Sequence, residues 1–302
     1  IKRKLEVEKA GEELFLELAL EDRRHAADLL RPIYDQTNGM DGWVSLEVSP
    51  LIIHDPVQTL AAAREFFVRA RRPNFMIKIP GTPEGLFVIE EAILAGVPVN
   101  AALLFSREQS LAAAEAFLRG IERRIDAGLA PNVSSVASVS VSRWDAAVDG
   151  KVPDDLCGRL GIAMAGRIYK AYREFLSSTR WERAYNCGAR PQRLVWVDTA
   201  IESPEASDVF SIASLVAPLT VNSLSETVLK AFAVNGRRIS AMPPDGGDCE
   251  RLLARYTQAS IDIDALAAKL QEEAIEAKVK SWFDLLSAIA YKSAALSSNR
   301  HR

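Results

Sequence analysis

Cysteine and histidine are both scarce in this sequence. The 302 residues include three of each, spread along the chain without the spacing of metal ligands. Cys157, Cys187 and Cys249 form no CxxC pair, which argues against a zinc site and a disulfide framework and indicates a reducing compartment. We therefore expect no bound metal.

Long apolar runs and an excess of positive charge are absent as well. No run approaches the roughly 20 residues of a membrane-spanning helix, and no signal-peptide pattern opens the chain. The formal net charge of −3 gives no electrostatic footprint for nucleic acid or an anionic membrane. These absences predict a cytoplasmic protein that works on small molecules, with neither nucleic acid nor membrane as a partner.

What the sequence does contain is a regular alternation of strand-like and helix-like segments. Short, nearly continuous apolar runs rich in Val, Ile and Phe are typical of parallel strands that are buried on both faces. The predicted strands are 43–48, 75–79, 99–105, 135–141, 194–199 and 219–222. Amphipathic helices are predicted between them, including 64–70, 107–127 and 156–177, and a long helix, 261–296, closes the chain. Asp55 followed by Pro56, and Ser106 followed by Gln109, are helix-start signals.

This alternation predicts an α/β fold with a parallel sheet, and no linker divides residues 1–302 into more than one domain. Six strands are two fewer than a TIM-type (β/α)8 barrel requires. The first forty residues look helical, so we expect the first two strands to be missing from an incomplete amino-terminal end. An open sheet of six strands would otherwise expose two long edges.

Lys78 is the first candidate for chemistry because it lies inside the apolar segment FMIKIP, residues 75–80. A lone lysine in a dry strand is costly unless it is paired or neutralised. Burial lowers the pKa of a lysine, and a neutral amine near a strand end can form an imine with a ketone. The alternative is a lysine that reaches the rim of the sheet as a solvated charge.

Glu47 occupies the equivalent place at the end of an earlier strand. A carboxylate and an amine on neighbouring strand ends can exchange protons through one water molecule, although a structural Lys–Glu pair is the alternative. Arg143 adds a cation at a third strand end. Asn100 could hydrogen-bond substrate hydroxyls, but alone it is more often a capping or turn residue.

The segment FMIKIPGTPEGL, residues 75–86, resembles the Schiff-base strand and following loop of the transaldolase family. The segment SLEVSP, residues 45–50, resembles the preceding strand of that family, and residues 100–106 resemble the next one. Further segments follow in family order, and the resemblance covers nearly the whole chain.

The resemblance implies an eight-stranded barrel and a class I aldolase-type transferase that needs no metal or organic cofactor. A three-carbon ketol unit would pass from a ketose or ketose phosphate to an aldehyde through an imine on Lys78, with Glu47 moving protons through a water molecule. Asn100 and Ser138 match substrate-contacting positions, and Arg143 matches an arginine that holds a phosphate. The partners would be sugars or sugar phosphates, and a homodimer is an open alternative to a monomer.

The chain departs from the family at several of these positions. Ala102 stands where a threonine helps to hold the catalytic water, and Ser140 stands where an aromatic residue is usual. Asp198 replaces a small hydroxyl residue, and Glu202 falls where a cation near the phosphate is usual. Ser140, Asp198 and Glu202 are therefore further candidates for substrate binding. Two like charges at ~4 Å repel by ~4 kcal/mol at an effective dielectric near 20, unless a loop shift turns Glu202 to solvent.

Three functions remain open from the sequence. The departures favour a transaldolase-like enzyme with altered substrate specificity. An ordinary transaldolase of the pentose phosphate pathway, in carbohydrate metabolism, is the first alternative. A non-catalytic ligand-binding protein is the second, because Ala102 has no hydroxyl group.

Overall fold

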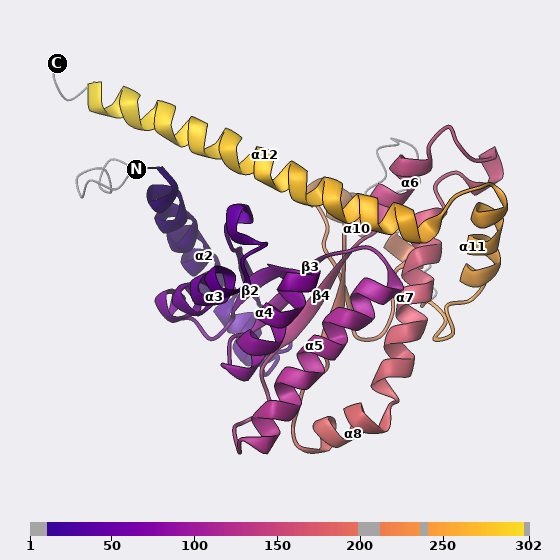
Figure 1. Ribbon diagram of the computed structural model, residues 1–302, viewed down its shortest axis with the longest axis horizontal. Helices are drawn as coiled ribbons and strands as arrows, with labels where there is room; N and C mark the ends of the chain where they lie inside the picture. Colours follow the sequence, from indigo (N-terminus) through magenta and orange to yellow (C-terminus); the bar gives the residue numbers. More distant parts are fainter. Residues whose placement is uncertain (1–10, 199–211, 236–240, 299–302) are drawn as a thin grey trace. The chain divides into compact units, whose positions relative to one another are not determined.

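The computed structural model describes residues 11–198, 212–235 and 241–298, and it has an α/β architecture (Figure 1). Its six strands are β1 (Val44–Glu47), β2 (Phe75–Pro80), β3 (Val99–Leu104), β4 (Ser135–Ser140), β5 (Arg193–Val197) and β6 (Thr220–Asn222). They follow the order of the chain in one sheet. β1 pairs with β2, β3 with β4, β4 with β5 and β5 with β6, all in parallel.

Each strand overlaps one of the six predicted segments, so the predicted α/β fold with a parallel sheet is confirmed. The arrangement fits the sheet of a TIM-type barrel. The expectation that two more strands belong to the barrel stays a prediction, as does the single-domain organisation.

Helices separate the strands along the chain. They are α2 (Gly11–Gln36), α3 (Pro56–Ala70), α4 (Pro83–Leu94), α5 (Arg107–Asp126), α6 (Ser142–Val148), α7 (Leu160–Leu176), α8 (Thr179–Asn186), α10 (Glu226–Asn235), α11 (Cys249–Gln258) and α12 (Ile263–Ser298). Two short 3-10 helices, η1 (Pro50–Ile52) and η2 (Asp154–Leu156), complete the described elements. Across the described ranges, no helix is both long and apolar enough to cross a membrane.

Two of the helices, α3 and α5, begin where the sequence predicted, and α4 begins with a similar cap. Asp55 caps α3 and Thr82 caps α4, each accepting a hydrogen bond from a backbone N–H and each followed by proline. Ser106 and Gln109 form a complete capping box at the start of α5. Such caps satisfy backbone donors that a helix leaves unpaired at its first turn. The helices therefore start within a few residues of the strands, which fixes the carboxyl ends of β2 and β3.

The chain divides into two compact units, residues 1–78 with 274–302 and residues 79–273, which are described separately. In the first unit, the Asn74 amide donates to the carbonyl oxygens of Ala27 and Gly42, both at 2.8 Å. The rings of Phe15 and Trp282 meet edge to face with centroids 4.6 Å apart. These contacts hold α2 against the start of β2 and against the carboxyl-terminal half of α12.

In the second unit, helices cover one face of the strands β3, β4 and β5. α5 packs against α4, α7 and α8, and α7 packs against α11, as the neighbouring ribbons in Figure 1 show. Phe117, Tyr169, Trp196 and Tyr256 are fully buried in this layer. Ser135 and Leu194 face this helix layer, whereas Asn100, Ser138 and Ser140 lie on the other face of the strands.

Candidate active site

Lys78 and Glu47 are direct register partners in the parallel pair of β1 and β2. Neighbouring strands lie about 4.8 Å apart, and paired residues project from the same face of a sheet. Glu47 is the last residue of β1, and Lys78 is followed by two more residues of β2. The amine and the carboxylate predicted from the sequence therefore lie side by side near the carboxyl ends of two strands.

The neighbours of Lys78 along β2 are apolar and closely packed. The other five residues of β2 are buried, and Lys78 itself is half-buried. Just after the strand, the Gly81 N–H donates to the carbonyl oxygen of Ala102 at 2.7 Å. Gly85 lies so close to this turn that an added methyl group would overlap the carbonyl oxygen of Pro80. Small residues in the loop thus fix the strand end that carries Lys78.

A second lysine, Lys278 of α12, contacts the carboxylate of Glu47. The Nζ atom of Lys278 lies 2.5 Å from Oε1 of Glu47, and the two side chains are 29% and 36% exposed. Sequence reasoning missed Lys278, because a lysine in a long amphipathic helix is usually on its solvated side. The available signal was spacing: Lys278 lies four residues from both Ala274 and Trp282, which are buried.

In the second unit, Asn100 and Ser138 come together as predicted from neighbouring strands. The buried Ser138 hydroxyl donates to Oδ1 of Asn100 at 2.7 Å. This bond fixes the orientation of the Asn100 side chain. An oriented amide of this kind is suited to binding a sugar hydroxyl.

Ser140, Asp198 and Arg143 form a second polar group in that unit. The Ser140 hydroxyl donates to Oδ2 of Asp198 at 2.8 Å, and Nε of Arg143 lies 3.8 Å from the same oxygen. Asp198 follows β5 with a φ of 52°, a left-handed conformation that aspartate and asparagine tolerate better than most residues. Its carboxylate thus lies beside the guanidinium that the family resemblance assigns to a phosphate.

One predicted position, Arg143, lies elsewhere than expected, and another, Glu202, is not among the described residues. Arg143 was placed at a strand end, but β4 ends at Ser140 and Arg143 belongs to the first turn of α6. The hydrogen bond of Ser142 N–H to the carbonyl oxygen of Asp198 starts this helix directly after the strand. Glu202 lies outside the described residues.

Asp145, a half-buried carboxylate, lies two residues after Arg143 on α6. It accepts hydrogen bonds from the backbone N–H groups of Leu160 and Gly161 at 2.8 and 3.2 Å, at the start of α7. Burial raises the pKa of Asp145 from 3.8 to about 6, although these two hydrogen bonds lower it. Its contacts make it a helix cap.

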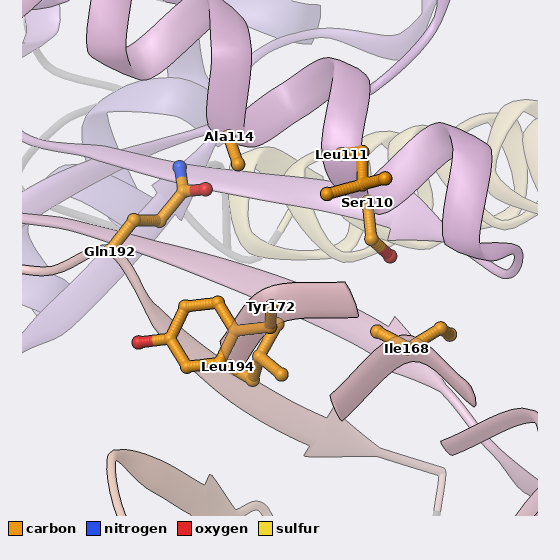
Figure 2. A pocket seen from close by; sticks show the side chains of 7 residues that line it. All are labelled: Ser110, Leu111, Ala114, Ile168, Tyr172, Gln192 and Leu194. Atoms are coloured by element: carbon orange, nitrogen blue, oxygen red, sulfur yellow. The ribbon is translucent and has the colours of Figure 1, made fainter. Parts of the chain in front are cut away.

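A small hollow lies on the helix-covered side of the sheet (Figure 2). It is lined by residues of α5 and α7 and by Gln192 and Leu194 at β5, and none of the candidate residues lines it. Its cavity volume of about 10 Å³ is room for about one water molecule, so a sugar does not fit. The Tyr172 hydroxyl on its wall is buried without a hydrogen-bond partner in the described part of the chain, and burial raises the pKa of this phenol.

Within the described ranges, no group of three or more His, Cys, Asp or Glu side chains is arranged to hold a metal ion. The candidate residues that the structure describes carry an amine, carboxylates, hydroxyls and a guanidinium. An amine beside a carboxylate suits imine formation, since one group attacks and the other moves protons.

Comparison with known proteins gives the family. The sequence model of the transaldolase/fructose-6-phosphate aldolase family matches residues 1–289. The transaldolase of Thermobifida fusca is 40% identical over 283 residues, which cover 91% of this chain and 77% of that protein. Transaldolase 1 of Streptomyces avermitilis is 39% identical over 279 residues, which cover 89% and 74%. The transaldolase of a Parafrankia species is 37% identical over 277 residues, which cover 89% and 75%.

The chain belongs to the transaldolase/fructose-6-phosphate aldolase family. It is an enzyme of the aldolase-type transferase class, as the sequence resemblance implied.

Proposed function

We propose that this enzyme transfers a three-carbon ketol unit from a ketose to an aldehyde through an imine on Lys78. The observation that carries the proposal is the register pair of Lys78 and Glu47 at adjacent strand ends. An amine in an otherwise buried strand can act as a nucleophile, and the paired carboxylate is placed to transfer protons to and from it.

The steps follow from the groups present. Glu47 takes a proton from the ammonium of Lys78, and the free amine adds to the ketone carbonyl. The resulting carbinolamine loses its hydroxyl group as water with the proton that Glu47 took up. The bond between the third and fourth carbons then breaks as the fourth-carbon hydroxyl gives its proton to a general base. The electron pair moves into the protonated imine, which leaves an enamine and releases the first aldehyde. The enamine adds to the acceptor aldehyde, whose oxygen takes back the proton held by the general base, and water hydrolyses the new imine to restore the amine.

Asn100 and Ser138 would contact substrate hydroxyls in this scheme, and Arg143 would bind an anionic or polar end of the substrate. The hydrogen bond that fixes Asn100 supports the first role. The carboxylate of Asp198 lies beside Arg143 and so affects which substrate group Arg143 can bind.

Reduction with borohydride tests the imine. Incubation of the wild-type enzyme with borohydride and either fructose 6-phosphate or unphosphorylated fructose should, with at least one of the two sugars, add the mass of one reduced three-carbon unit to the intact protein. The Lys78→Ala variant should gain nothing under the same conditions. A non-catalytic relative that only binds the sugar would show no gain in either protein, and this result would overturn the proposal.

We propose further that the specificity is shifted toward substrates without a phosphate. The carboxylate of Asp198 lies beside Arg143 and accepts a hydrogen bond from Ser140. It therefore neutralises the positive charge of Arg143 that would otherwise attract a phosphate. A phosphate that approached Arg143 would have to displace or tolerate this negative charge. Unphosphorylated sugars would meet no such repulsion.

Ordinary transaldolase activity is the second candidate, and the names of the relatives favour it. A coupled assay with fructose 6-phosphate and erythrose 4-phosphate, run beside unphosphorylated acceptors, separates the two. Equal or greater kcat/KM for the phosphorylated acceptor would remove the case for shifted specificity.

A further inference from the structure

The ion pair between Lys278 and Glu47 differs from the other ion pairs of α12. Lys269 with Glu273, and Lys280 with Asp284, are pairs within the helix whose side chains are mostly exposed. Lys278 instead reaches another element, the end of β1, and both partners are more than half buried. Its position in the row of buried Ala274 and Trp282 turns it toward the packed side of the helix.

The group that Lys278 contacts is the register partner of Lys78. An ammonium 2.5 Å from Oε1 fixes one oxygen of the Glu47 carboxylate and so determines where the second oxygen lies. The second oxygen is then available to a water molecule that moves protons to and from the nitrogen of Lys78. A carboxylate that rotated freely would hold such a water molecule less well.

We propose that Lys278 is a positioning residue that orients Glu47 for proton transfer at Lys78. This role rests on the proposed imine mechanism. Lys278 acts through Glu47. During imine formation the oriented carboxylate takes the proton that the ammonium of Lys78 releases and passes it to the departing hydroxyl, which leaves as water. During hydrolysis the same proton returns to the amine through Glu47. Lys278 itself neither gains nor loses a covalent bond.

The test combines single variants with a double variant. Lys278→Met keeps the length of the side chain and removes its charge, and we expect it to lower kcat about 10- to 100-fold, the cost of misplacing a proton-transfer group, with KM nearly unchanged. Lys278→Gln should show the same loss, and Lys278→Arg should recover most of it. Lys280→Met, on the same helix, is the matched control and should equal the wild type.

The double variant separates positioning from general stability. Because Lys278 acts through Glu47, Lys278→Met should cost little further activity when Glu47 is already Gln. A Lys278→Met enzyme that keeps wild-type kcat, or losses that multiply in the double variant, would overturn the role. Wild-type protein that traps no substrate with borohydride would overturn the imine mechanism itself, whereas trapping with an unaffected Lys278→Met variant would overturn this role alone.

Discussion

Replacement of Asp198 by asparagine removes one negative charge beside Arg143 and little else. Asparagine has nearly the same shape, and it tolerates the left-handed backbone that Asp198 adopts with φ of 52°. Its side-chain oxygen can still accept the hydrogen bond of Ser140. A change in substrate preference would therefore report the charge.

The expected size follows from the geometry. The carboxylate lies 3.8 Å from the guanidinium, and the two side chains are 53% and 43% exposed. Two unit charges at ~4 Å interact by ~4 kcal/mol at a dielectric near 20 and by ~1 kcal/mol in water. Because both groups are about half exposed, we take the lower part of this range, about 1–2 kcal/mol. That corresponds to roughly 5- to 30-fold in kcat/KM for a phosphorylated acceptor.

The assay compares erythrose 4-phosphate with unphosphorylated erythrose as acceptor for the wild type and for Asp198→Asn. We expect the gain for the phosphorylated acceptor alone, and we expect it to shrink as salt is added because the charges are partly exposed. Asp155→Asn is the control, since it removes the same charge from an exposed carboxylate that pairs with Arg255. An equal change for both acceptors, or no change for either, would refute the charge argument.

Two further predictions concern stability. Gly85→Ala should lower the free energy of unfolding by roughly 1–3 kcal/mol in urea titration, because the new methyl group would overlap the carbonyl oxygen of Pro80; unchanged stability would mean that the turn after β2 yields easily. The pKa of Asp145 is raised to about 6 in the folded protein, so the folded state holds this proton more tightly than the unfolded state. The contribution of Asp145 to the free energy of unfolding is greatest below pH 3.8. It falls by roughly 3 kcal/mol as the pH rises to about 6, and it is constant above that pH. Asp145→Asn should lack this part of the pH dependence of unfolding, and an identical pH profile would contradict it.

Much of the framework could be predicted from the sequence, because it depends on local patterns. Apolar runs located all six strands, and the caps at Asp55 and Ser106 located two helix starts. Lys78 and Glu47 could be paired before the structure was known, since each lies near the end of one of two consecutive parallel strands.

The remaining features of the site depend on tertiary packing. The left-handed turn that brings Asp198 onto Ser140 has no local sequence signal, because aspartate adopts many backbone conformations after a strand. The start of α6 before Arg143 depends on a hydrogen bond from Ser142 to Asp198, which lies in a distant part of the chain. The contact of Lys278 with Glu47 depends on how α12 packs in its unit.

The central claim is that the side-chain nitrogen of Lys78 forms the covalent bond to substrate. Peptide mapping by mass spectrometry after reduction with borohydride in the presence of fructose 6-phosphate or unphosphorylated fructose tests it most directly, because a modified Lys78 also blocks tryptic cleavage at that position. We predict a three-carbon adduct on the peptide that spans Lys78 and none on the peptide that contains Lys278. An adduct on another lysine, or an unmodified Lys78 in protein that turns over substrate, would contradict the account.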